Sequence, residues 1–124
     1  MNLKALLLAA MAAACLAAPL SCAPAQAAGA LAVGHCGVDG YSYNNADRQQ
    51  AEDTALSQCG PGCKIVLTFE RACGAFATDA NKSCGAEGWG RGSDRGEAEE
   101  IAVRECVNQG GEQCAVKRWV CDGG

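Results

Sequence analysis

The second half of this 124-residue chain repeats the first half, and its cysteines return in the same order. The segment Gly-Ala-Leu-Ala-Val at residues 29–33 comes back as Gly-Ala-Phe-Ala-Thr at residues 74–78. Four cysteines of the first copy match four of the second: Cys36 with Cys84, Cys59 with Cys106, Cys63 with Cys114 and Cys73 with Cys121. These matches predict one small domain built from two similar units, at about residues 29–73 and 74–121.

The first 27 residues have the pattern of a signal peptide. Lys4 gives a positive start, residues 5–18 are apolar, and residues 25–27 have the small–x–small form of a cleavage site. The apolar stretch is shorter than the about 20 residues that a membrane-spanning helix needs. We therefore expect cleavage after Ala27, a mature domain at residues 28–124 and no stable membrane insertion. A retained anchor and lipid attachment at Cys22 are the alternatives.

Cysteine content and charge indicate the compartment and exclude one class of partner. Removal of Cys15 and Cys22 with the signal peptide leaves eight of the ten cysteines in the mature domain. This density in a short exported chain is typical of a disulfide scaffold in an oxidising compartment, either the periplasm or the exterior. The net charge of −4 argues against nucleic acid as the partner, because nucleic-acid binding needs a basic surface.

Each unit shows the pattern strand, glycine-rich loop, helix, strand. The opening strands are residues 29–33 and 74–78, and the first helix is expected to stop at the Gly-Pro-Gly of residues 60–62. The closing strands are residues 65–69 and 115–120. The second closing strand carries a Lys-Arg pair at residues 117–118, which is typical of an edge strand.

A duplicated βαβ unit predicts an α+β domain with a ferredoxin-like βαββαβ order. In that fold the four strands form one antiparallel sheet, and two helices cover one of its faces. We expect the two opening strands to lie side by side in the centre. The alternative is a pair of βα units that exchange strands or pair across a dimer.

The duplication also suggests disulfide pairs, since matched cysteines are expected to pair in matched ways. In each unit one short bond would link the end of the helix to the strand that follows it, and one long bond would join the two ends of the unit. The predicted bonds are Cys59–Cys63, Cys106–Cys114, Cys36–Cys73 and Cys84–Cys121. An alternative for the long bonds is Cys73–Cys84 with Cys36–Cys121.

No pattern in the chain indicates catalysis, a metal or a cofactor. His35 precedes Cys36, but the cysteine spacings are not those of a zinc site, and no Cys-x-x-Cys opens a helix. We therefore expect no metal, no cofactor and no enzyme activity. The alternative is a small hydrolase that uses the acidic residues of the second helix, Glu97, Glu99, Glu100 and Glu105.

The best candidates for a binding site lie in the two glycine-rich loops. Aromatic residues and arginine are the types enriched at binding hot spots. The candidates are Tyr41 and Tyr43 in the first loop and Trp89 and Arg91 in the second. Tyr41 and Trp89 could instead cap the thin core. We expect a non-catalytic module that binds an unknown protein or cell-envelope component.

The order of these motifs resembles the bacterial secreted family called domain of unknown function 4189. The resemblance runs from residue 29 to residue 121 and depends on the strand, the aromatic glycine loop, the alanine-spaced helix and the cysteines together. Tyr41 stands where a tryptophan is more usual in that family. The resemblance implies export and a small cysteine-bearing domain, and it implies no catalytic residues.

Overall fold

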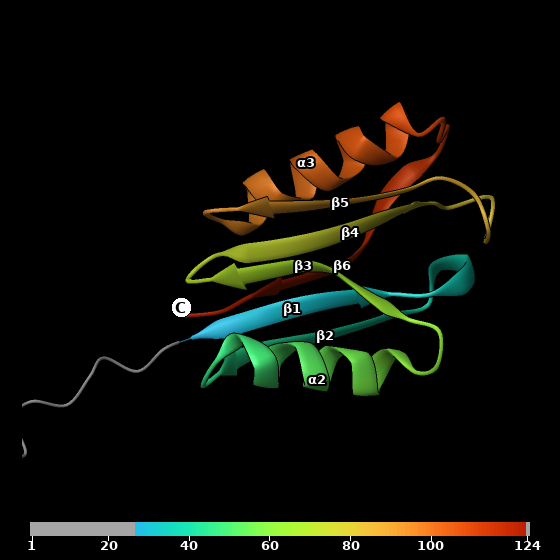
Figure 1. Cartoon of the computed structure of the whole chain (residues 1–124). Helices are drawn as coiled ribbons and strands as arrows, with labels where there is room; N and C mark the ends of the chain where they lie inside the picture. Colours follow the sequence, from blue (N-terminus) through green and yellow to red (C-terminus); the bar gives the residue numbers. More distant parts are fainter. Residues whose placement is uncertain (1–26, 124) are drawn as a thin grey trace, which may run out of the picture.

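The computed structural model describes residues 27–123, so nearly all of the predicted signal peptide lies outside the described residues. The order strand–strand–helix–strand occurs twice along the chain (Figure 1). The elements of the first half are β1 (Ala28–Val33), the short 3-10 turn η2 (His35–Gly37), β2 (Asp39–Asn45), α2 (Arg48–Cys59) and β3 (Lys64–Glu70). Those of the second half are β4 (Cys73–Asp79), β5 (Glu87–Gly92), α3 (Arg95–Asn108) and β6 (Cys114–Cys121).

The strands form two separate antiparallel sheets, with the orders β2-β1-β3 and β5-β4-β6. The α+β class, the two helices and the opening and closing strands are as predicted. The prediction of one four-stranded, ferredoxin-like sheet with both helices on one face is wrong. The reason is that each glycine-rich segment is a strand, β2 or β5, which pairs with its own opening strand and completes a sheet within each half.

The glycines of β2 and β5 mark places where a helix lies directly on the strand. A Cβ on Gly40 would lie 2.2 Å from the carbonyl oxygen of Ala55, and a Cβ on Gly88 would lie 2.2 Å from that of Ala102. A Cβ on Gly90 or on Gly92 would lie 2.6 Å from a backbone atom of Ala98 in α3. These glycines allow the helix to pack closely on the sheet. In the sequence they look like loop residues, but in the structure they belong to strands.

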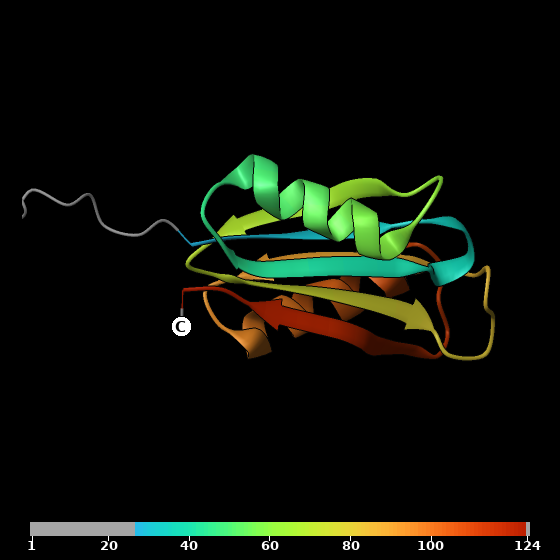
Figure 2. The same cartoon turned by 90° about the horizontal axis from the view of Figure 1, so that it is seen from below.

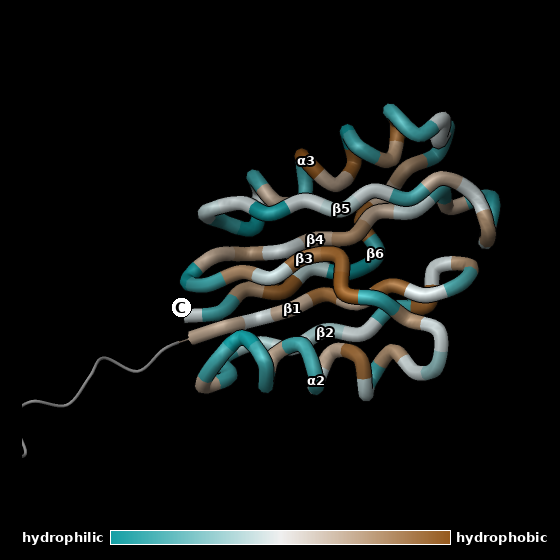
Figure 3. The backbone as a smooth tube through the Cα atoms, in the orientation of Figure 1, coloured by the Kyte–Doolittle hydropathy of each residue, from teal (hydrophilic) through white to brown (hydrophobic). Residues whose placement is uncertain are grey.

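The molecule has four layers, helix, sheet, sheet and helix. Figure 1 shows α2 and α3 on the two outer sides with the sheets between them, and Figure 2 shows the same arrangement from below. Buried alanines pack each helix on its sheet, with Ala51 and Ala55 in the first half and Ala98 and Ala102 in the second. The hydropathy colouring in Figure 3 places hydrophobic stretches along β1 and β3 and hydrophilic residues along both helices.

A second cluster of side chains lies between the two sheets. Leu31, Val33 and Phe76 are buried there, and Tyr41 and Trp89 pack against them from the sides. This core is small: its large, fully buried side chains among the described residues are Leu31, Phe76 and Phe69, whose ring lies between Gly29 of β1 and Gly74 of β4. The prediction that Tyr41 and Trp89 would cap the core, given as an alternative to a binding role, agrees with this packing.

Four disulfide bonds link the eight cysteines of the described residues. The short bonds Cys59–Cys63 and Cys106–Cys114 are confirmed. The predicted long bonds Cys36–Cys73 and Cys84–Cys121 are wrong, and so is the alternative Cys73–Cys84 with Cys36–Cys121. The long bonds are Cys36–Cys84 and Cys73–Cys121.

The strand register explains the long bonds. Cys73 opens β4 directly opposite Cys121, the last residue of β6 in the same sheet. In the first half the corresponding pair is Ala28 opposite Glu70, so Cys73 belongs to the start of the second half and not to the end of the first. Cys36 then bonds to its own match, Cys84, across the seam between the halves.

Polar contacts join the halves along this seam. β6 lies at an edge of its sheet, as predicted, and its two basic residues reach across to the first half. Lys117 Nζ donates to the carbonyl oxygen of Gly37, and Arg118 pairs with Asp39. At the other end of the molecule the buried Asp122 carboxylate accepts hydrogen bonds from two backbone N–H groups of the link between β3 and β4, at 3.0 and 3.3 Å.

Candidate binding site

The four predicted binding residues lie at two places. Tyr41 and Tyr43 are on β2, and Trp89 and Arg91 are on β5. In the stacked sheets β2 contacts β6, and β5 contacts β3, so the two pairs of residues occupy opposite edges of the sandwich. The structure therefore does not bring all four into one surface, and each edge has to be considered by itself.

The β2–β6 edge is closed by an ion pair. Arg118 Nε lies 3.0 Å from Asp39 Oδ2, and its guanidinium carbon lies 4.7 Å from the centre of the Tyr41 ring. The hydrogen bond to Asp39 raises the pKa of Arg118, while desolvation acts in the opposite direction. Tyr41 is thus held between the core and a fixed cation. Tyr43, farther along β2, is 55% exposed.

The β3–β5 edge carries a groove of about 840 Å³. Its floor is the segment from Gly85 to Arg91, which includes most of β5, and one wall is Leu67 of β3. The other wall consists of Ile101, Glu105 and Gln109 of α3. Both halves of the chain contribute to this groove, and it contains two of the four predicted residues, Trp89 and Arg91.

Trp89 and Arg91 are held in the groove by different contacts. Trp89 is half-buried, since it packs on the core between the sheets and also lines the groove. Arg91 is exposed, and its Nη1 donates a hydrogen bond of 2.8 Å to the carbonyl oxygen of Thr68 on β3. This bond fixes the arginine across the gap between β5 and β3 and explains why a charged residue stands between two glycines.

The strands β2 and β5 occupy matched edges of the two sheets but differ in whether a side chain is bonded to the outer edge, the one that faces away from the central strand. In the first half Gln58 Oε1 accepts a hydrogen bond of 3.0 Å from the N–H of Tyr41. Trp89 faces Phe76 in the same register in which Tyr41 faces Leu31, so its N–H also points away from the sheet.

The residue that corresponds to Gln58 is Glu105. Within residues 27–123 no side chain accepts a hydrogen bond from the N–H of Trp89, and the β5 edge lies open at the floor of the groove. An open edge strand presents unpaired N–H and C=O groups that another strand can join.

The acidic residues of α3 are spread over its surface. Glu97 accepts a hydrogen bond of 2.8 Å from Ser93 Oγ near the start of the helix, and Glu99 pairs with Arg95. Of the four glutamates considered for acid–base chemistry, only Glu105 lines the groove, where Glu87 of β5 is the second carboxylate. Glu105 is exposed and Glu87 is half-buried.

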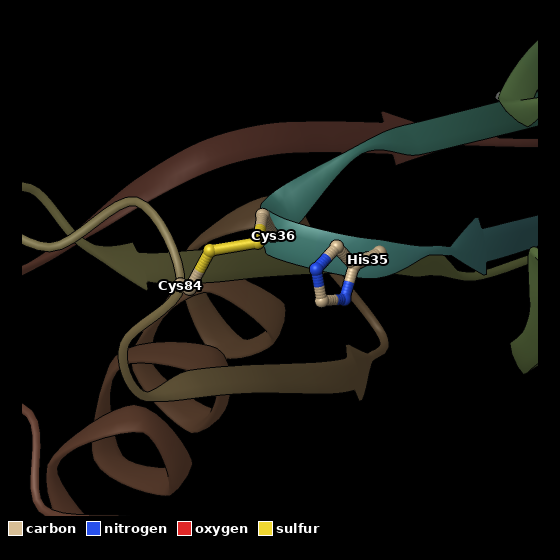
Figure 4. Close-up of side chains that lie close together, drawn as sticks. All are labelled: His35, Cys36 and Cys84. Carbon is tan, nitrogen blue, oxygen red and sulfur yellow. A yellow bond between two sulfur atoms is a disulfide. The ribbon is translucent and has the colours of Figure 1, made fainter.

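Within residues 27–123 one group of side chains is close enough to hold a metal ion, namely His35, Cys36 and Cys84. A ring nitrogen and the two sulfurs lie within 4.8 Å of one another at the end of the molecule formed by η2 and the β4–β5 turn (Figure 4). The two sulfurs are bonded to each other. In this oxidised form they are not thiolate ligands.

Sequence reasoning missed the groove as a whole because its parts come from segments far apart in the chain. Leu67 and Ile101 look like ordinary core residues in the sequence, and only the stacking of β5 on β3 brings them to one surface. Nothing in the sequence marked the open edge, because a glutamate at position 105 can accept a hydrogen bond as the glutamine at position 58 does.

Residues 28–121 match the family model described as Domain of unknown function (DUF4189), and the chain belongs to this family. This confirms the resemblance seen in the sequence. No curated protein and no solved structure matches the chain.

Proposed function

We propose that this member of the DUF4189 family is a non-catalytic binding module, and that the groove along β5 binds an extended segment of another protein. One observation carries the proposal: the edge strand β5, where no side chain of residues 27–123 accepts a hydrogen bond from the Trp89 N–H, forms the floor of a groove of about 840 Å³. This geometry favours binding over the hydrolase alternative, because an open strand edge beside apolar side chains is suited to accept another strand.

The proposed mode of binding is the addition of a strand to the sheet. Main-chain hydrogen bonds between the ligand and β5 would give affinity, and alternate side chains of the ligand would point into the groove. β5 has six residues, so it offers room for a ligand segment of about 20 Å at about 3.3 Å per residue. Trp89 and Leu67 provide apolar contact area for one ligand side chain.

The charge of the surroundings favours a basic ligand. Glu87 and Glu105 line the groove, and the whole chain has a net charge of −4. The one basic residue of the groove, Arg91, is already engaged with the carbonyl of Thr68. Complementary charges steer association and help to select the partner. We therefore infer a segment in which apolar and basic residues alternate.

We further propose that binding takes place in the periplasm or outside the cell. The four disulfide bonds are consistent with an extracytoplasmic protein, because such bonds persist where the environment is oxidising. Across residues 27–123 the structure contains no helix with the length and apolar character required to cross a membrane. The partner would be a protein or another component of the cell envelope.

Synthetic peptides test the proposal. The probe is a capped hexapeptide of alternating lysine and valine, compared with a glutamate–valine peptide and with a lysine–valine peptide N-methylated at alternate amides. We expect the first to bind by calorimetry, the second to bind more weakly and the third to lose binding, because N-methylation removes the donors that pair with the edge. Equal binding of the methylated peptide, or no binding of the first, would contradict strand addition.

Two variants with the same charge change locate the site. Glu105→Lys lies in the groove, and Glu100→Lys lies on the same helix outside it. Reversing the charge at position 105 removes one attraction to a basic side chain of the ligand and adds one repulsion, each about 0.7 kcal/mol. Glu105→Lys is therefore expected to weaken binding about tenfold. Glu100→Lys is expected to bind within about twofold of wild type. Equal losses in the two variants would indicate a general charge effect instead of a site.

A further inference from the structure

The Cys36–Cys84 disulfide differs from the other three bonds in its accessibility. Cys84 is exposed and Cys36 is half-buried, while each of the other bonds has one buried partner: Cys59, Cys73 or Cys106. Attack by a thiolate on a disulfide requires access to a sulfur atom. A dithiol reductant will therefore reach the Cys36–Cys84 bond before it reaches the others.

The backbone around Cys36 favours opening of this bond. Cys36 has a φ of 55°, in the left-handed region that residues with a side chain rarely adopt, and Gly37 follows with a φ of 79°. The bond to Cys84 holds Cys36 in this conformation between β1 and β2. Once the bond is broken, the residue can relax to a more favourable conformation, which adds to the tendency of an exposed disulfide to be reduced.

The opened site carries three ligands for a soft metal ion. His35 is exposed beside both sulfurs, and one ligand atom from each of the three residues lies within 4.8 Å of the others (Figure 4). Lys117 Nζ, which donates to the carbonyl of Gly37, adds a positive charge nearby that stabilises thiolates. We propose that reduction of Cys36–Cys84 creates a site in which two thiolates and the imidazole of His35 bind one soft metal ion, Zn²⁺ or Cu⁺.

The chemistry balances in two steps. A dithiol reductant gives two electrons and two protons to the disulfide, so that the S–S bond breaks, two thiols form and the reductant becomes a disulfide. The metal ion then displaces the two thiol protons to solvent and accepts a lone pair from a neutral ring nitrogen of His35. Thiolates and imidazole are the ligands that Zn²⁺ and Cu⁺ prefer.

The distances fit such a site after small movements. Metal–sulfur bonds of about 2.3 Å and metal–nitrogen bonds of about 2.0 Å place ligand atoms about 3.5–3.8 Å apart around a tetrahedral ion. The sulfurs must separate to that distance, and the ring nitrogen starts within 4.8 Å of both. All three residues lie in turns, η2 and the segment between β4 and β5, where such shifts disturb no strand pairing. Solvent can supply a fourth ligand at this exposed position.

The first experiment follows the order of reduction in the full domain. The folded protein is titrated with dithiothreitol, free thiols are alkylated, and the modified cysteines are identified by mass spectrometry. We expect the first two thiols to be those of Cys36 and Cys84, with the other three bonds intact. Release of thiols from another pair first, or from all pairs together, would overturn the proposal.

The second experiment measures metal binding by the partly reduced protein. Zn²⁺ and Cu⁺ are each added in competition with a chromophoric chelator, and one ion per chain is expected to bind. The oxidised protein and the double variant Cys36→Ser with Cys84→Ser serve as controls and are expected not to compete. His35→Ala is expected to be reduced at the same step and to bind at least tenfold more weakly. Equal affinity with and without His35, or binding by the double variant, would refute the site.

Discussion

The close approach of α3 to β5 can be tested by adding one methyl group. In Gly88→Ala the new Cβ would lie 2.2 Å from the carbonyl oxygen of Ala102 and 2.3 Å from the amide nitrogen of Cys106. Both atoms belong to the helix backbone, so no side chain can rotate away. Ordinary contacts of this kind are above about 3.2 Å, so the helix has to lift by about 1 Å from a tightly packed sheet.

The cost of that shift follows from what lies under the helix. Ala98, Ala102 and Cys106 are fully buried against Ala75 and Ala77 of β4. Overpacking costs about 1–3 kcal/mol in general, and here the contacts of the whole helix face are loosened as well. We expect Gly88→Ala to lower the free energy of unfolding by about 3 kcal/mol, a large part of the about 5–15 kcal/mol typical of a domain.

Urea denaturation with intact disulfides, followed by circular dichroism, measures this loss. Gly96→Ala is the matched control, because Gly96 is exposed in the first turn of α3 and a Cβ there would meet only Asp94 Oδ1 at 3.4 Å. Alanine is the better helix former, so the control is expected to gain about 0.5 kcal/mol. A loss below about 1 kcal/mol for Gly88→Ala would mean that α3 does not rest on β5, and would refute the packing.

Three further predictions concern the seam and the polar contacts of the fold. The double variant Cys36→Ser with Cys84→Ser opens a loop of 48 residues and is expected to lose about 4 kcal/mol of stability in urea; a loss below about 1 kcal/mol would contradict the bond. Ser42→Ala removes a buried hydroxyl that accepts from the N–H of Ala30 and donates to the carbonyl of Ala51, and is expected to lose about 2 kcal/mol in the same assay; an unchanged midpoint would contradict the bridge. Hydrogen bonds from backbone N–H groups, that of Asn81 first, lower the pKa of Asp79 in the folded protein. The ionised carboxylate therefore stabilises the fold fully above the pKa that Asp79 has in the unfolded chain, about 4, and this stabilisation is lost as the pH falls through the lower pKa of the folded state. Urea midpoints measured against pH are expected to fall less steeply below pH about 4 in Asp79→Asn than in wild type, and parallel curves would exclude the contribution.

Sequence patterns predicted those parts of the fold that depend on local signals. Alternating apolar residues marked the opening and closing strands, and the short spacing from Cys59 to Cys63 allowed a bond across one turn. The strands β2 and β5 were missed because glycine is rare in strands, and nothing local distinguishes a glycine under a helix from a glycine in a loop. With these two strands missing, the remaining four strands suggested a single sheet, with strand exchange or pairing across a dimer as the alternative.

The long disulfides and the candidate site depend on tertiary position. Cys73 is the last residue of the first unit as predicted from the sequence, and only the pairing of β4 with β6 places it at the start of the second. Trp89 and Arg91 could be selected from residue type, but their separation from Tyr41 depends on which sheet edges stack together. Only the structure shows that a hydrogen bond to the Thr68 carbonyl holds the Arg91 side chain in place.

Hydrogen exchange at two matched amides tests the binding proposal most directly. The N–H of Tyr41 is already bonded to Gln58, whereas Trp89 lines the groove and its N–H has no side-chain acceptor within residues 27–123. With saturating lysine–valine peptide, exchange measured by NMR is expected to slow at least tenfold at Trp89 and to stay unchanged at Tyr41. Unchanged exchange at Trp89, or equal slowing at both amides, would contradict strand addition at β5.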